Sequence, residues 1–94
     1  MRDDEFEWDD AKAASNLADH KVSFEVARLA FNDPYPRAWE DISEDYGEQR
    51  FVLIGMVDGR LLTVAYTERD ERIRIISARG AEPYEARLYH EEHD

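Results

Sequence analysis

The dipeptide Asp58-Gly59 constrains the fold of this chain more than any other feature of its sequence. It separates two strand-like runs, residues 50–57 and 60–67, of which the first is almost continuously apolar. A two-residue type I′ turn requires positive φ at both central positions, and Asp-Gly is among the pairs that tolerate this best. The sequence therefore predicts an antiparallel hairpin, with the apolar run placed inside a sheet.

Three further segments extend this hairpin. Residues 72–78 predict another strand, which follows a polar turn at 68–71 and alternates in its first half. Residues 36–41 are a candidate fourth strand, and an acidic loop follows them at 42–47. Residues 6–8 resemble a very short strand at the start of the chain.

Helical signals occupy the first third of the chain and its end. Asp9 and Ser23 are candidate N-caps for two helices, the first of which should end near residue 19. The second should end before Pro34, because proline disfavours helical backbone in the residue that precedes it. Residues 81–92 predict a C-terminal helix with Pro83 in its first turn.

The order of these elements predicts an α+β fold: a short N-terminal strand, two helices, an antiparallel β-meander of three to four strands and a C-terminal helix. We expect one sheet face to be covered by helices and the other to be free for binding. The length of 94 residues fits a single domain over residues 1–94. No apolar run approaches the roughly 20 residues that span a bilayer, and the first residues do not resemble a signal peptide, so we expect a cytoplasmic protein without membrane contact.

Charge is unevenly distributed along the chain. The net charge is −11, whereas proteins that bind nucleic acid through non-specific phosphate contacts are usually basic. Residues 50–80 differ, because six arginines oppose four acidic residues there. Arginine forms bidentate pairs with phosphate or carboxylate. The segment is therefore a candidate phosphate-binding surface, with cross-strand ion pairing as the alternative. Its arginines are Arg50, Arg60, Arg69, Arg72, Arg74 and Arg79.

Several short motifs keep a fixed order along residues 6–90. They include F-E-W-D at 6–9, V-S-F-E at 22–25 and G-R-L-L at 59–62, and the most specific is I-R-I-I-S-A-R at 73–79. Together they resemble the BrnT toxin family. One departure is the turn at residues 19–21, Asp-His-Lys where the family typically has Lys-His-Gly; the acidic net charge is another.

The resemblance implies a small bacterial type II toxin with a fold like the RelE ribonucleases. Such a toxin is expected to cleave RNA without a metal ion or other cofactor and so arrest translation. Its expected partners are RNA and a cognate antitoxin, a small DNA-binding protein of the BrnA kind, and a homodimer is an open option. The alternative is a catalytically inactive relative that keeps only the antitoxin-binding surface, which the acidic charge favours.

Metal-free RNA cleavage needs cationic donors for the charge that builds on the phosphate. Arg79 is our first candidate, and its alternative is an ion pair with Glu82 or Glu85. Arg60 is a second candidate, with a simple exposed residue beside the turn as its alternative. Arg74 is a candidate RNA-binding residue, but in a regular strand it would point to the face opposite Arg79 unless a bulge intervened.

The reaction also needs a base and an acid. Glu48 is a candidate base, and an ion pair with Arg50 is its alternative. His20 is a candidate proton carrier because imidazole changes charge near neutral pH. Its alternative is a structural histidine at the C-terminus of a helix.

Four further residues are candidate RNA contacts. Arg50 could bind phosphate, and Tyr66 could donate a hydrogen bond to phosphate or fill the core. Trp8 and Phe51 could stack on bases, although a tryptophan beside a helix start is more often a core anchor.

Overall fold

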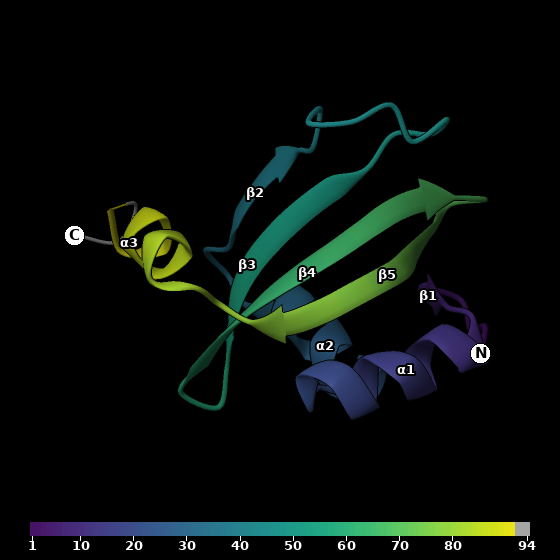
Figure 1. Ribbon diagram of the computed structural model, residues 1–94, viewed down its shortest axis with the longest axis horizontal. Helices are drawn as coiled ribbons and strands as arrows, with labels where there is room; N and C mark the ends of the chain where they lie inside the picture. The colour runs from purple at the N-terminus through teal and green to yellow at the C-terminus, as the bar shows by residue number, and fades with distance from the viewer. Residues whose placement is uncertain (92–94) are drawn as a thin grey trace.

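The computed structural model describes residues 1–91 and contains one five-stranded sheet with helices on both of its faces (Figure 1). The predicted α+β class and order of elements are confirmed. The elements are β1 (Phe6–Glu7), α1 (Asp10–His20), α2 (Phe24–Ala27), the 3₁₀ helix η1 (Arg28–Asn32), β2 (Arg37–Glu40), β3 (Phe51–Val57), β4 (Arg60–Arg69), β5 (Arg72–Gly80) and α3 (Pro83–Glu91). The last residue predicted for the C-terminal helix, residue 92, lies outside the described part of the chain.

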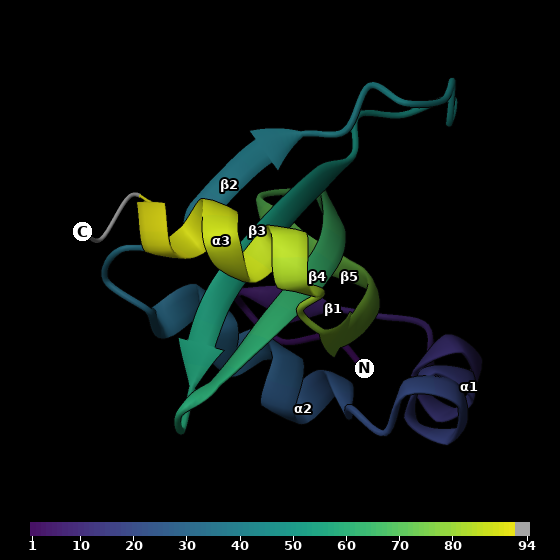
Figure 2. The ribbon, with the colours of Figure 1, turned by 60° about the vertical axis from the view of Figure 1, so that its left-hand side comes forward.

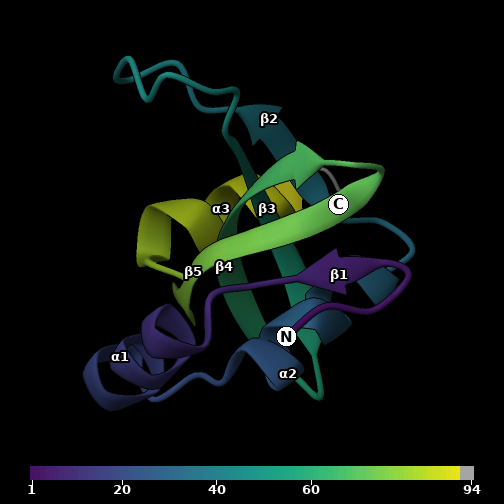
Figure 3. The ribbon, with the colours of Figure 1, turned by 90° about the vertical axis from the view of Figure 1, so that its right-hand side faces the viewer.

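The strands are ordered β1-β5-β4-β3-β2. All neighbours are antiparallel except β1, which runs parallel to β5 and lies beside it in Figure 3. Asp58 and Gly59 take φ values of 48° and 81°, so the predicted hairpin between β3 and β4 is confirmed. β3 has β2 on its other side, which places the apolar run inside the sheet as expected.

The second hairpin turn is tighter than predicted. β4 continues to Arg69 and β5 begins at Arg72, so the polar turn consists of Asp70 and Glu71 alone rather than residues 68–71. Both turn residues have positive φ, 53° and 63°. The prediction was too wide because neither residue is a glycine, the usual signal for this conformation.

Both predicted N-caps are confirmed. The Asp9 carboxylate accepts hydrogen bonds from the N–H groups of Ala11 and Lys12, and the Ser23 hydroxyl accepts one from Val26. Lys21, where the related family typically has glycine, takes the left-handed φ of 61°. The turn between α1 and α2 thus keeps a conformation that glycine adopts more easily, despite the different residue.

The first face of the sheet, which we call the covered face, packs against α1, α2 and η1. Its fully buried side chains include Phe24 from α2 and Leu62 and Val64 from β4. Gly55 lies directly beneath η1, where a Cβ atom would stand 2.4 Å from the carbonyl oxygen of Ala30. The absence of a side chain at residue 55 therefore lets the helical layer approach the strands closely.

The second face, which we call the open face, is only partly free. α3 crosses β3 on this side of the sheet, and Ile54, which points to this face, is fully buried (Figure 2). The Tyr89 hydroxyl of α3 donates a 2.7 Å hydrogen bond to Asp33, which also accepts the N–H of Met56. The expectation of one uncovered face therefore holds for only part of the sheet. Within residues 1–91, no helix has the length and apolar character needed to cross a membrane.

Candidate active site on the open face

The open face carries a hollow of about 340 Å³, which we call the sheet hollow. Its floor follows one row across four strands, because Trp39, Val52, Ala65 and Ser77 are successive partners in the sheet register. The loop after β2 and the start of α3 complete its walls. The lining residues are Trp39, Asp41, Ser43, Val52, Thr63, Ala65, Ser77, Arg79, Tyr84 and Glu85.

A bulge in β5 decides which arginines face this side of the sheet. Ser77 pairs with Ala65 but Ile75 already pairs with Tyr66, so Ile76 is an extra residue in β5. Side chains alternate along a strand, and the extra residue shifts that alternation by one. Arg74 and Arg79 therefore share the open face, which a regular strand would have prevented.

Arg79 forms a fork with Glu85 at the wall of the sheet hollow. Its two terminal nitrogens lie 2.6 and 3.0 Å from the two carboxylate oxygens. Glu85 is only 2% exposed, whereas the side chain of Arg79 keeps 35% of its surface exposed. The ion pair that we considered as the alternative for Arg79 is thus present, and the guanidinium still faces the hollow.

The fork also sets the charge of both groups. Burial raises the pKa of Glu85, but the hydrogen bonds from Arg79 and from the N–H of Glu82 outweigh it and leave the pKa below its usual value. The hydrogen bond to Glu85 raises the pKa of Arg79. Both groups are therefore ionised at neutral pH, and Glu85 is a weak proton acceptor.

Arg74 is paired with an acid too. Its guanidinium lies 3.1 Å from a carboxylate oxygen of Glu7 on the neighbouring strand β1. The other oxygen of Glu7 is buried and makes no hydrogen bond within the described residues. Arg74 thus neutralises the negative charge of the largely buried Glu7, the last residue of β1.

Arg60 lies on the other side of the sheet. It pairs with Val57 and precedes the buried Leu62 by two residues, so it points to the covered face. Its guanidinium lies over Gly80, where a Cβ atom would come within 3.1 Å of Nη2. Arg60 and Arg79 are therefore not brought together in one hollow.

Glu48 and Arg50 belong to the loop between β2 and β3, and they do not line the sheet hollow, although Asp41 and Ser43 of the same loop do. Their side chains form a 3.0 Å ion pair, and the Arg50 guanidinium lies 4.3 Å from the centre of the Tyr46 ring. Asp41, which lines the hollow, accepts hydrogen bonds from Ser43 and Tyr46 that lower its pKa. The loop is thus held in place by hydrogen bonds and ion pairs although it is strongly acidic.

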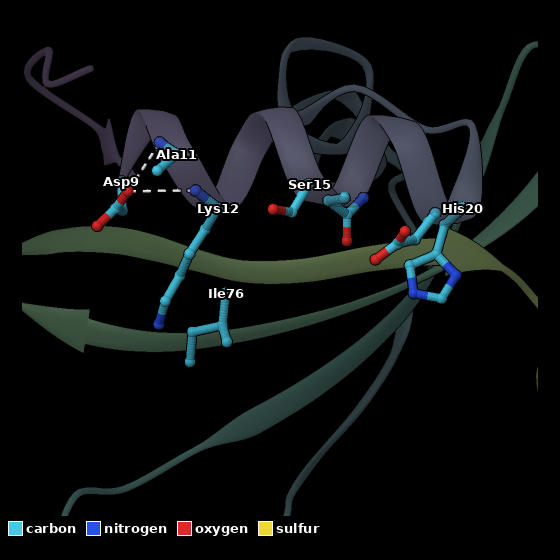
Figure 4. Close-up of a pocket in the computed structure, with 8 residues that line it drawn as sticks. Asp9, Ala11, Lys12, Ser15, His20 and Ile76 are labelled. Carbon is cyan, nitrogen blue, oxygen red and sulfur yellow. Dashed lines mark hydrogen bonds between the residues drawn. The ribbon is translucent and has the colours of Figure 1, made fainter.

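His20 lines a different cavity, which we call the helix groove. It lies between α1 and β5, and Lys12 and Ser15 project into it from the same side of α1 (Figure 4). His20 is the last residue of α1. This position agrees with the alternative considered for it, a structural histidine at the C-terminus of a helix. Ile76, the bulge residue, is the contribution of β5 to this groove.

The aromatic residues predicted to stack on bases point to the covered face. Trp8 is 5% exposed and packs edge-on against Phe24. Phe51 stacks on Tyr66, whose ring also packs edge-on against Phe31. Burial raises the pKa of Tyr66. These aromatic rings contribute mainly to packing.

Sequence reasoning missed the two aromatic residues of the sheet hollow, Trp39 and Tyr84. Trp39 was inside a predicted strand, but only its pairing with Val52 reveals which face it occupies. Tyr84 follows Pro83 at the helix start, and no local pattern indicates that this helix end reaches the sheet. Within residues 1–91, no three His, Asp or Glu side chains lie close enough together to hold a metal ion.

Comparison with known proteins agrees with the resemblance seen in the motifs. A search of curated proteins gives no match. A family model described as "Ribonuclease toxin, BrnT, of type II toxin-antitoxin system" matches residues 8–85, a span that includes every element from α1 to β5 and the start of α3. This chain therefore belongs to the BrnT family of ribonuclease toxins of type II toxin–antitoxin systems.

Proposed function

We propose that this protein cleaves RNA without a metal ion, arrests translation and is neutralised by a cognate antitoxin. The family supports the general class of this activity. The observation that carries the proposal is the position of Arg79, a partly exposed guanidinium that two hydrogen bonds to Glu85 hold at the wall of a hollow on the open face.

The chemistry assigned to the hollow is transfer of the phosphate to the neighbouring 2′-hydroxyl of the RNA. A base removes the 2′-hydroxyl proton, the 2′-oxygen attacks phosphorus, and the bond to the 5′-oxygen breaks as that oxygen receives a proton. Arg79 would stabilise the negative charge that builds on the phosphate, a role for which a guanidinium is well suited.

Glu48 is our proposed base. It does not line the sheet hollow itself but belongs to the same loop as Asp41 and Ser43, which do, whereas His20 lines the separate helix groove. Glu85 is unsuited to the role, because its forked pair with Arg79 lowers its pKa. Glu48 is 41% exposed and could exchange Arg50 for substrate with little loss, since exposed ion pairs contribute weakly to stability.

The test is cleavage of RNA by the purified, antitoxin-free chain in the presence of a metal chelator. We expect Arg79→Ala to reduce the rate by about 100-fold, the usual effect of removing one donor to a developing oxyanion. Arg69→Ala is the matched control, because Arg69 is exposed and lies at the Asp70-Glu71 turn, outside the hollow. Equal cleavage by the parent chain and a folded Arg79→Ala variant would contradict the assignment.

The antitoxin is expected to present a partly basic surface. The toxin carries a net charge of −11, so attraction between the two proteins should weaken as salt screens it. Titration of the complex by calorimetry at increasing ionic strength tests this. An affinity that does not change with salt would show that charge contributes little to the recognition.

A second candidate function is antitoxin binding without catalysis. It is favoured by the acidic net charge and by the fork with Glu85, which occupies two of the Arg79 donors that a phosphate would use. In that case the folded chain would bind its antitoxin but would leave both free RNA and ribosome-bound RNA intact. Cleavage of either substrate by the parent chain, lost in Arg79→Ala, would exclude this alternative.

A further inference from the structure

Two exposed aromatic side chains flank the sheet hollow, and the proposed cleavage chemistry does not use them. Trp39 on the edge strand β2 is 36% exposed, and Tyr84 at the start of α3 is 51% exposed. Both line the same hollow as Arg79. The aromatic rings predicted from sequence to meet RNA, those of Trp8 and Phe51, point instead to the covered face.

The floor between these walls is made of small or short side chains. Trp39 pairs with Val52, which pairs with Ala65, which pairs with Ser77. Neighbouring strands are about 4.8 Å apart, so about 14 Å separates the backbone at Trp39 from that at Ser77. Val52, Ala65 and Ser77 leave the space above this row empty, which makes the indole of Trp39 accessible from the hollow.

The two ends of the row differ in chemistry. At the β2 end, Trp39 offers an extended aromatic surface on which a nucleic-acid base can stack. At the β5 end, Arg79 offers a guanidinium that suits a phosphate, and the Tyr84 hydroxyl lies 3.5 Å from the carboxylate that holds that guanidinium. Bases and phosphates alternate along every RNA strand, and the hollow offers a surface for each at its two ends.

We propose that Trp39 is the base-stacking residue of this toxin, and that it binds an unpaired base of single-stranded RNA while a phosphate of the same strand reaches Arg79. Tyr84 lines the phosphate end of this subsite. The inference rests on the proposed ribonuclease function. It specifies the substrate class further, as single-stranded RNA in which a base can unstack from its neighbours. A base in a duplex is stacked and paired, so duplex RNA should bind more weakly.

The first experiment measures affinity for a labelled single-stranded RNA oligonucleotide in which every 2′-hydroxyl is methylated. This probe lacks the nucleophile of the cleavage reaction, so binding is measured separately from catalysis. We expect Trp39→Ala to raise Kd about tenfold, the lower part of the range for loss of one stacked base. Trp39→Phe should retain most of the affinity because it keeps an aromatic face.

Two controls separate stacking from general surface effects. Tyr35→Ala removes another exposed aromatic ring, 71% exposed and outside the lining of the hollow, and should leave Kd unchanged. An oligonucleotide with abasic sugars keeps the phosphates but has no bases. The parent chain and Trp39→Ala should bind this abasic probe equally well.

A spectroscopic readout follows from the tryptophan content. The chain has two tryptophans, and Trp8 is buried in the covered-face core. In a Trp8→Phe background the remaining fluorescence reports Trp39 alone, and stacking should quench it when the methylated oligonucleotide binds. The affinity measurements use the otherwise unchanged chain, so they stand even where Trp8→Phe folds poorly.

The outcomes distinguish this inference from the function on which it rests. Cleavage that depends on Arg79, together with an affinity that Trp39→Ala leaves unchanged, would overturn the stacking subsite and keep the ribonuclease. Loss of antitoxin binding in Trp39→Ala, with RNA affinity intact, would overturn it in favour of a protein contact. A parent chain that neither binds the methylated probe nor cleaves RNA would overturn both proposals.

Discussion

The two faces of this sheet are built from the same strands, yet they differ in what holds them in place. On the covered face, Phe24, Leu62 and Val64 are fully buried and the contacts are mainly apolar, with the buried polar side chain of Asn16 hydrogen-bonded to the backbone of Ala78. On the open face, residues of the same strands line a hollow whose wall is held by the buried carboxylate of Glu85. Apolar burial on one side therefore stabilises the fold and leaves the other side free to carry polar and charged groups.

The largest difference between the faces should appear on removal of one core side chain. Phe24→Ala is expected to lower the free energy of unfolding by about 4 kcal/mol, because it removes a fully buried aromatic ring and leaves a cavity. Val52→Ala, on the partly exposed floor of the sheet hollow, should cost about 1 kcal/mol. Urea unfolding of both variants measures the contrast, and equal losses would contradict it.

The next largest effect should come from the ion pair of the open face. Glu85→Gln is expected to cost about 2 kcal/mol at neutral pH, less than the roughly 3–5 kcal/mol for a fully buried pair, because Arg79 is partly exposed to solvent. The folded pKa of Glu85 lies below its ordinary value, so the contribution is present above that value and is lost as pH falls through the folded pKa. The matched control is Glu82→Gln, which changes an exposed neighbour.

Urea unfolding at neutral pH and at about pH 3 measures this prediction. The gap between the parent chain and Glu85→Gln should narrow at the acidic pH, because that pH lies below the ordinary glutamate pKa and the contribution of the Glu85 charge to stability is then being lost. A gap of the same size at both pH values would show that the charge of Glu85 contributes nothing to stability.

A smaller effect is expected where α3 is anchored to the remainder of the fold. Tyr89→Phe removes the hydroxyl that donates to Asp33 and should cost about 1 kcal/mol. Burial, followed by the hydrogen bond to Asp33, raises the pKa of Tyr89 to about 12. The contribution of the Tyr89 hydroxyl to the free energy of unfolding should therefore be complete below the ordinary tyrosine pKa of about 10. It should be lost as the pH rises through the pKa of Tyr89 in the folded protein.

Urea unfolding measures the stability of Tyr89→Phe, with Tyr84→Phe as the control. Tyr84 is exposed, and its hydroxyl lies 3.5 Å from the Glu85 carboxylate. An ultraviolet titration of the parent chain should show a tyrosine with a pKa of about 12 that is missing in Tyr89→Phe, whereas Tyr66, whose pKa is also raised by burial, ionises late in both chains. A tyrosine with a pKa of about 12 that persists in Tyr89→Phe would assign the shift to another residue.

The smallest effect on stability is expected on the floor of the hollow. Ser77→Ala should change the free energy of unfolding by less than about 0.5 kcal/mol, because it removes one hydroxyl from a partly exposed position. The affinity for the methylated oligonucleotide should nevertheless fall by about twofold, the lower part of the range for one hydrogen bond. A stability loss without any change in affinity would place Ser77 with the structural residues.

Much of the secondary structure followed from local chemistry. Asp58-Gly59 fixed one hairpin because Gly has no Cβ and Asp tolerates positive φ. Asp9 and Ser23 began helices because their side chains satisfy backbone N–H groups at the helix start. The Asp70-Glu71 turn was predicted too wide, because both residues have positive φ although neither is a glycine, the usual local signal. That residues 1–94 form a single domain stays a prediction.

The candidate site was harder to predict, because it depends on register. Arg79 was recognised, and Glu82 and Glu85 were the two candidate partners for an ion pair with it. The structure confirms the pair with Glu85. Whether Arg74 joins Arg79 depended on a bulge at Ile76, and nothing in the residues around it signals an extra position. Trp39 could not be assigned to a face until its partner on β3 was known.

The sequence by itself determined the α+β order of elements, the helix starts, one tight turn and the family, because each of these depends on side chains close together in the chain or on motif order. Only the tertiary structure decided that Arg74 and Arg79 share the open face, that Arg60 points away from them, and that Trp39 and Tyr84 flank one hollow. Strand register and bulges arise from contacts between distant segments, and a shift of one residue turns a side chain to the opposite face.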